Sequence, residues 1–148
     1  MSTSASLTTL NSAMTQLMRA IRRVDEAQGI GRARLSALAV LHFGGRCTSS
    51  ELAAQEMVSR ATMHHILKGL EADGLVQRRP DRDDGRRQLV CLTRQGRAAI
   101  RKAHRARISW LEQLAAGMDA ADLEKAALAL DTLRNRSFGP VAPGLVRR

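Results

Sequence analysis

Residues 48–74 decide the fold of this chain, because they contain two consecutive helix starts; they read TSSELAAQEMVSRATMHHILKGLEADG. Thr48–Glu51 has the S/T-x-x-E form of a capping box, in which the hydroxyl caps the first amides of a helix and the glutamate reaches back. A short helix over 50–56 should follow. Ser59 is a good N-cap for a second helix, over 60–73, whose apolar residues recur at spacings of three and four. The stretch therefore predicts two short helices joined by a tight break.

The remaining sequence surrounds this pair with further helices and a hairpin. Two β-prone runs, 75–78 and 88–92, flank the charged, turn-forming run 80–87. Glycines and helix caps delimit four more helices, over 7–28, 34–43, 94–116 and 120–136. Three helices followed by a hairpin indicate a winged helix-turn-helix. The predicted fold class is mainly α with a small β-hairpin wing, together with a second helical layer.

The first helix carries a regular apolar seam, formed by Leu7, Leu10, Met14, Leu17, Ile21 and Val24. These residues are spaced by three and four, which places them in a stripe along one face. Such a stripe packs inside its own subunit or against a partner chain, and its regularity near the terminus favours a partner. In the last helix we expect four residues to point inward, namely Leu123, Ala127, Leu130 and Leu133.

The charge balance indicates an anionic partner. Lys and Arg number 24 against 14 Asp and Glu, which leaves a net charge of +10. From Arg78 to Arg107, eleven cations stand against three acids, so these thirty residues carry +8. Codon bias can explain the abundance of arginine but not this clustering. A charge run is often only a solvated face, but beside a capped helix pair and a hairpin it favours binding to the phosphates of duplex DNA.

The second helix of the pair offers the side chains that reading DNA requires. A helix in the major groove reads base edges with its N-terminal turns. The residues that the core does not need there, and that we expect to contact DNA, are Ser59, Arg60, Thr62, His64, His65 and Lys68. At the cap of the preceding helix we expect phosphate contacts from Thr48, Ser49 and Ser50. The alternative is an ordinary amphipathic helix with a polar face.

Four segments, taken in order, resemble the MarR family of multiple-antibiotic-resistance-type regulators: Val58–Thr62, Leu70–Arg78, Asp81–Arg87 and Leu92–Gly96. The resemblance covers about 7–133 and is strongest over 48–96. It implies a homodimer whose two winged helices bind a pseudo-palindromic operator in double-stranded DNA. It divides the chain into an N-terminal dimerisation helix (1–30), a DNA-binding region (31–96), C-terminal dimerisation helices (97–136) and an irregular tail (137–148).

The resemblance also implies roles for residues of the wing. Arg86 would enter the minor groove, and Asp84 would hold the guanidinium of Arg86 in place. Gly85 stands between them, where the family often has a polar or basic residue, so the choice between Arg86 and Arg87 stays open. The expected wing contacts are Arg82, Asp84, Arg86 and Arg87. Narrow minor grooves attract arginine electrostatically, so the role is physically sensible.

The resemblance implies a regulatory signal as well. Similar proteins usually repress nearby genes and release DNA when a small, often aromatic or phenolic, ligand binds between their layers. Candidate residues of this effector pocket are Met14, Met18, His42, Phe43 and Trp110, and core packing is the alternative for each. Redox sensing through Cys47 or Cys91 is a second alternative, because cationic neighbours could lower the pKa of Cys91. Neither cysteine lies in the first helix, where the family's peroxide sensors carry theirs.

Other classes of protein find little support. The sequence has no glycine-rich phosphate loop, nucleophile elbow or H-E-x-x-H motif, and its histidines and cysteines lack the spacing of metal ligands, so we expect neither an enzyme nor a metal or other cofactor. Residues 1–6 lack the features of a signal peptide, and no apolar stretch is long enough to span a bilayer. We therefore expect a soluble, cytoplasmic protein with no membrane partner. A winged helix that binds proteins, or one that packages DNA without reading it, is the remaining alternative.

Overall fold

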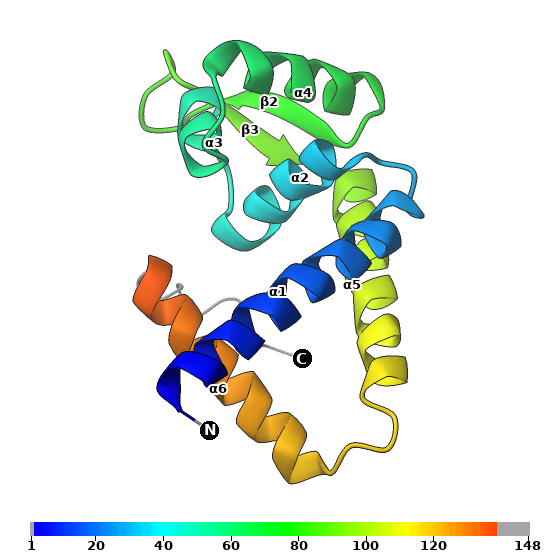
Figure 1. Cartoon of the computed structure of the whole chain (residues 1–148). Coiled ribbons are helices and arrows are strands. Elements are labelled where there is room, and N and C mark those ends of the chain that lie inside the picture. Colours follow the sequence, from blue (N-terminus) through cyan, green and yellow to red (C-terminus); the bar gives the residue numbers. More distant parts are fainter. Residues whose placement is uncertain (1, 139–148) are drawn as a thin grey trace.

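The computed structural model describes residues 2–138, which fold into six helices and three short strands (Figure 1). In chain order these are α1 (Thr3–Glu26), α2 (Arg32–Gly44), β1 (Cys47–Thr48), α3 (Ser49–Gln55), α4 (Arg60–Ala72), β2 (Val76–Pro80), β3 (Gln88–Leu92), α5 (Arg94–Leu114) and α6 (Ala120–Phe138). The predicted fold class is confirmed, since the chain is mainly helical with a small winged sheet. None of the helices in this part of the chain combines the length and the apolarity that crossing a bilayer requires.

The winged-helix lobe consists of α2, α3, α4 and the sheet, and it is built around one apolar core. Leu38 of α2, Leu52 of α3, Leu67 of α4 and Val90 of β3 are completely buried in it. Removing these aliphatic side chains from water is the main force that holds the lobe together. Gly74 has a φ of +67° and ends α4 in the left-handed conformation that glycine adopts readily.

The sheet has one strand more than the sequence predicts. Its order is β1-β3-β2 with both pairings antiparallel, so β3 lies in the centre. The predicted hairpin is present, with Val76 opposite Leu92 and Pro80 opposite Gln88. The added strand β1 has only two residues and pairs Cys47 with Val90. A two-residue strand has no periodicity of its own, so only its tertiary pairing reveals it.

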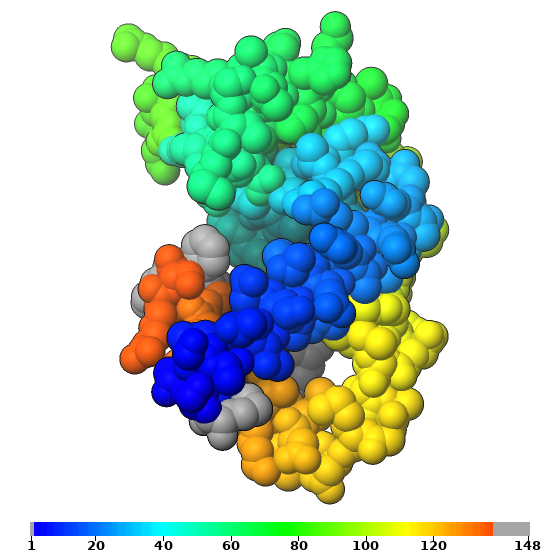
Figure 2. All heavy atoms as spheres, in the orientation of Figure 1, coloured from blue at the N-terminus to red at the C-terminus, as the bar shows by residue number. Residues whose placement is uncertain are grey.

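A second layer of helices, α1, α5 and α6, lies at the end of the molecule opposite α3 and α4 (Figures 1 and 2). Helix α1 begins four residues before the predicted start, because the Ser2 hydroxyl accepts a hydrogen bond from the Ala5 amide and caps the helix there. Helix α5 begins after its N-cap, Thr93, and leads from the lobe into this layer.

The prediction that four residues of α6 point inward is wrong for the single protomer. Leu123, Ala127, Leu130 and Leu133 are all exposed. The core of the described chain is made by residues of α2, α3, α4, α5 and the sheet, and α6 contributes none to it. The seam of α1 is likewise exposed or at most half-buried. Regular spacing identified the apolar face of each helix, but the spacing could not tell what covers that face.

Candidate DNA interface

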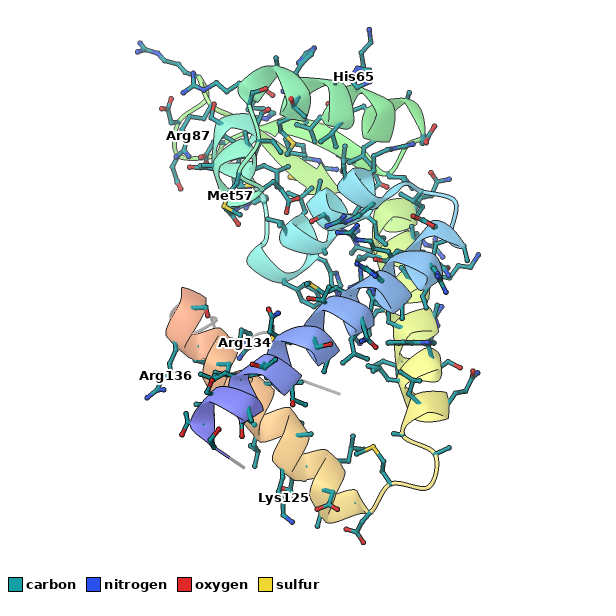
Figure 3. The ribbon with its side chains drawn as sticks, viewed as in Figure 1. Met57, His65, Arg87, Lys125, Arg134 and Arg136 are labelled. Carbon is teal, nitrogen blue, oxygen red and sulfur yellow. The ribbon has the colours of Figure 1, made fainter. Side chains whose placement is uncertain are left out.

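The polar face of α4 forms the outer surface of the winged-helix lobe. All six residues predicted for DNA reading are exposed, while Met63, Leu67 and Leu70 on the opposite face are buried. His65 projects outward from α4 at the far edge of the lobe (Figure 3). Arg60, His64 and Lys68 follow one another at intervals of four, so they lie in one row along the helix. This row presents hydrogen-bond donors of different length on the exposed face of α4.

The N-terminus of α4 is fixed by the predicted cap. The Ser59 hydroxyl accepts a hydrogen bond from the Thr62 amide at 3.0 Å, and the two hydroxyl oxygens lie 2.8 Å apart. A helix N-terminus carries a partial positive charge and unpaired amides, which suit a phosphate oxygen. Arg60 is exposed in the first turn and makes no ion pair within residues 2–138. This end of α4 is therefore a cationic surface.

The first cap of the helix pair is the predicted capping box. The Glu51 amide donates to the Thr48 hydroxyl at 3.2 Å, and the Thr48 amide donates to Glu51 Oε2 at 2.7 Å. The amide and hydroxyl of Thr48 hold the pKa of the Glu51 carboxyl below its usual value, and Arg87 adds to this effect. The Thr48 hydroxyl serves the cap, and Ser49 is half-buried, whereas Ser50 is exposed. Of these three predicted phosphate contacts, Ser50 is therefore the most accessible.

The wing loop, residues 81–87, is held by its own hydrogen bonds. The Arg87 amide donates to the Asp84 carbonyl, and the Asp81 amide donates to the Arg87 carbonyl, both at 2.9 Å. Asp84 Oδ1 accepts from the backbone amide of Arg86 at 3.1 Å. The expected contact between Asp84 and the Arg86 guanidinium is not among the ion pairs of the described residues, so that expectation needs correction. Asp84 shapes the turn because a short carboxylate readily accepts an amide two residues ahead.

Arg86 and Arg87 take different roles in this geometry. The Arg87 guanidinium turns back to α3, where Nη2 lies 2.7 Å from Glu51 Oε1, and it also lies 3.7 Å from Asp81 (Figure 3). Glu51 thus holds the cap of α3 with one oxygen and the base of the wing with the other. Arg86 is exposed, and its guanidinium has no acidic partner in the described part of the chain. Arg86 is therefore the better placed of the two to reach a groove.

The basic run from Arg78 to Arg107 is divided between two parts of the molecule. Five of its eleven cations lie on β2 and the wing loop, and six lie on α5, which leads away from the wing (Figure 1). Four of the eleven have protein partners: Arg78 pairs with Glu71, Arg87 with Glu51, Arg97 with the Leu92 carbonyl and Arg107 with Asp25. The run was expected beside the hairpin, but only its first half lies there, because α5 carries the residues from Arg94 onward away from the wing.

Nothing in the sequence indicated that Arg34 would support the C-terminal end of α4. Arg34 of α2 donates to the Gly69 carbonyl at 3.1 Å and pairs with Asp73, the C-cap of α4. A cation at the C-terminal end of a helix satisfies free carbonyls and complements the helix dipole. The partners lie 35 and 39 positions from Arg34, so only the fold brings them together.

The candidate effector residues are dispersed. Met14 and Met18 are exposed on α1, Trp110 is half-buried on α5, and the rings of His42 and Phe43 meet edge-to-face at the end of α2. Of the five, His42 lines a hollow of about 270 Å³ between α2, β3 and the start of α5. The hollow is also lined by Arg46, Cys91 and Arg97. It is a different site from the one expected from the sequence.

The two cysteines differ in their surroundings. Cys47 is buried, and burial raises the pKa of its thiol, with further contributions from Glu51 and Cys91. A raised pKa disfavours the reactive thiolate. Cys91 is half-buried and reaches the hollow beside Arg46 and Arg97. Of the two thiols, Cys91 is therefore the better candidate for chemistry.

Comparisons with known proteins agree with this geometry. Residues 28–87 match the MarR family. An uncharacterised HTH-type transcriptional regulator of Mycobacterium bovis is 30% identical over 124 residues, which make up 84% of this chain and 87% of that protein. The uncharacterised HTH-type transcriptional regulator YdgJ of Bacillus subtilis is 30% identical over 75% of this chain and 66% of its own length.

Solved structures share the fold. A transcriptional regulator of Thermotoga maritima superposes with a TM-score of 0.70 at 25% identity, covering 90% of this chain and 99% of that one. A MarR family protein of Bacillus stearothermophilus superposes with a TM-score of 0.82 at 16% identity, covering 93% and 99%. The match over the helix pair and wing loop, the M. bovis relative and the exposed polar face of α4 agree on one conclusion: the chain belongs to the MarR family of DNA-binding transcriptional regulators.

Proposed function

We propose that this chain is a ligand-responsive repressor that binds a pseudo-palindromic operator as a homodimer. The observation that carries the proposal is the position of two exposed surfaces at opposite ends of the protomer. One end presents the polar row of α4 beside the wing, and the other presents apolar side chains of α1, α5 and α6. A protein that reads two half-sites needs both surfaces, one for DNA and one for its own second copy.

The apolar end supports dimerisation. In the single protomer, large apolar side chains there are between two-fifths and three-fifths exposed, including Leu7, Leu17, Leu111, Leu114, Leu123 and Leu128. Leu17, Leu111, Leu114 and Leu123 line a groove of about 410 Å³. A soluble monomer rarely exposes so much contiguous apolar surface, and a closed two-fold dimer of identical chains is the commonest way of covering it. We assign a second copy of this chain as the occupant.

The charged end supports the reading of a duplex. In the proposed complex α4 enters the major groove, with Arg60, His64, His65 and Lys68 at base edges or phosphates. Ser59, Thr62 and the α3 cap, through Ser50, lie against the backbone, and Arg86 reaches the adjacent minor groove. Arg82 is exposed in the same loop and adds charge beside the phosphates. Since the target is chromosomal, the protein would act in the cytoplasm.

Selection of bound fragments from the source genome tests the proposal directly. We expect a few enriched fragments, each with two inverted half-sites about one helical turn apart. Binding should weaken steeply with salt, because arginines displace counterions from the phosphates. Uniform recovery of all fragments would instead indicate non-specific packaging, and no recovery at all would favour a protein-binding winged helix.

The dimer has its own test. Leu17→Asp places a charge in the apolar groove, and we expect a monomer in analytical ultracentrifugation. Met57→Asp is the matched control, because Met57 is 87% exposed in the lobe, away from the groove. A dimeric Leu17→Asp protein would contradict the proposed interface, and a monomeric control would show that the introduced charge acts non-specifically.

A thiol response is a second candidate for the signal, favoured by Cys91, which lines the hollow of about 270 Å³ together with Arg46 and Arg97. Oxidants attack the thiolate form of an accessible cysteine. Peroxide treatment should then release operator from the wild type and from Cys47→Ser, but not from Cys91→Ser. Equal release from all three proteins would rule the thiol out as the sensor.

A further inference from the structure

One ion pair with a buried carboxylate joins α1 to α5, close to the winged-helix lobe; the arginine side chain of this pair is 42% exposed. Asp25, in the last turn of α1, is 6% exposed and is the one charged or polar residue that is buried in the described part of the chain. Its two carboxylate oxygens accept hydrogen bonds from Nε and Nη2 of Arg107, midway along α5, both at 2.6 Å. The two residues lie 82 positions apart.

The presence of this pair is not by itself evidence that it stabilises the packing of the two helices. Burying a carboxylate is costly, and a well-packed apolar pair of the same size is often as stable or more so. What an apolar pair cannot provide is a directional interaction that fixes how the two helices are oriented. Two parallel hydrogen bonds from the planar fork of an arginine fix the orientation of the carboxylate as well as its distance. The Asp25–Arg107 pair therefore fixes the angle between α1 and α5.

Helix α5 is also fixed at its other end, to the turn that follows α4. The Thr93 hydroxyl donates to the Gly74 carbonyl at 2.6 Å, and the Thr93 amide donates to the Leu75 carbonyl at 3.1 Å. Gly96 lies so close to Leu75 that a Cβ atom there would be 1.9 Å from the Leu75 carbonyl oxygen. The start of α5 therefore moves together with α4.

Helix α5 thus acts as a lever between the apolar surface and α4. Thirteen residues separate Arg107 from Arg94, which is about 20 Å along the helix. A tilt of about 10° at Arg107 would move the far end by about 3.5 Å, comparable to the rise of one base pair, about 3.4 Å. A change of angle of this size at the ion pair therefore displaces α4 by about the rise of one base pair, so the angle bears on the distance between the two half-sites that the dimer can reach.

We propose that the Asp25–Arg107 pair is a specificity determinant that sets the half-site spacing accepted by the dimer. The pair touches no DNA and acts only by positioning α4, and the inference rests on the proposed function as a homodimer on two half-sites. It predicts that removing the fork relaxes the spacing preference without removing the ability of α4 to recognise a half-site.

The test uses the full chain and a panel of duplexes that carry the selected half-sites, with the central spacer at its native length or changed by one or two base pairs. The first variant is Arg107→Lys, which keeps the charge and the stem but loses the bidentate fork. The second combines Asp25→Leu with Arg107→Met, which replaces the pair by apolar side chains and keeps the net charge. Arg105→Met is the control, since Arg105 is exposed on the same helix and makes no ion pair within residues 2–138.

We expect the wild type and Arg105→Met to prefer the native spacer by about ten-fold or more, a discrimination typical of one disrupted position. Both variants of the pair should bind all spacers within about three-fold of one another, while binding of an isolated half-site stays within about three-fold of the wild type. A variant of the pair that is folded and dimeric but keeps the wild-type ranking of spacers would overturn this inference and leave the proposed function intact. Absence of binding by the wild type to every duplex would overturn the proposed function, and the inference with it.

Discussion

Gly96 and Gly69 offer a sharp test of the packing between α5 and the winged-helix lobe. Both are helical glycines, and helix propensity alone predicts that alanine stabilises either position by about 1 kcal/mol. The structure predicts opposite signs. At Gly69 a Cβ atom would meet Arg34 at 3.6 Å, an ordinary contact, so Gly69→Ala should stabilise the protein by about 1 kcal/mol.

At Gly96 the same atom would lie 1.9 Å from the Leu75 carbonyl oxygen and 3.2 Å from a methyl group of Leu92. Backbone has to move by about 1 Å or more, and overpacking of this kind costs about 1–3 kcal/mol. The movement also disturbs the hydrogen bonds from Thr93 to Leu75, worth about 1 kcal/mol each. After the gain in propensity, Gly96→Ala should lower the free energy of unfolding by about 2–4 kcal/mol.

Thermal unfolding followed by circular dichroism distinguishes these outcomes at one fixed protein concentration, because the stability of an oligomer depends on concentration. For a chain of this size we expect Gly96→Ala to lower Tm by about 5–10 °C and Gly69→Ala to raise it by about 2–4 °C. A Gly96→Ala protein as stable as the wild type would show that α5 does not pack closely against Leu75. The lever argument for Arg107 would then lose its fixed end.

Three further outcomes follow from single contacts. Arg86→Ala should weaken operator binding by about 1–3 kcal/mol in gel-shift titrations, whereas Arg87→Ala should have the smaller effect, because Arg87 already pairs with Glu51; equal losses would contradict these roles. The pKa of Glu51 is lowered below its usual value of 4.5, so its contribution to stability is complete above that pH and is lost as the pH falls through the folded-state pKa. Between pH 7 and 3, the free energy of unfolding should consequently fall more steeply with falling pH in the wild type than in Glu51→Gln. Equal slopes would show that the lowered pKa of Glu51 does not contribute to stability. Met57 is exposed and has a φ of +53°, which is strained for a residue with a side chain. Met57→Gly should therefore raise the free energy of unfolding in urea by up to about 1 kcal/mol, because glycine relieves this strain at a smaller entropic cost. A clear loss of stability would count against the strain.

Local sequence was sufficient for the features that depend on neighbours in the chain. The capping box at Thr48, the N-cap at Ser59 and the left-handed stop at Gly74 each depend on contacts within a few residues, and all three are present. The hairpin and the exposed face of α4 follow in the same way from turn residues and apolar spacing. Local signals of this kind were therefore enough to predict both the helix-turn-helix and the wing.

Contacts between distant residues were decided only by the tertiary structure. Arg87 rather than Arg86 braces the wing because Glu51, 36 positions earlier, lies within reach. The ion pair of Asp25 with Arg107 and the support of α4 by Arg34 have the same character, since a charged residue in a sequence does not indicate its partner. Apolar spacing likewise identified the apolar faces of α1 and α6 but not what packs against them. A face buried in the core of its own chain and a face that packs against a second copy have the same periodicity.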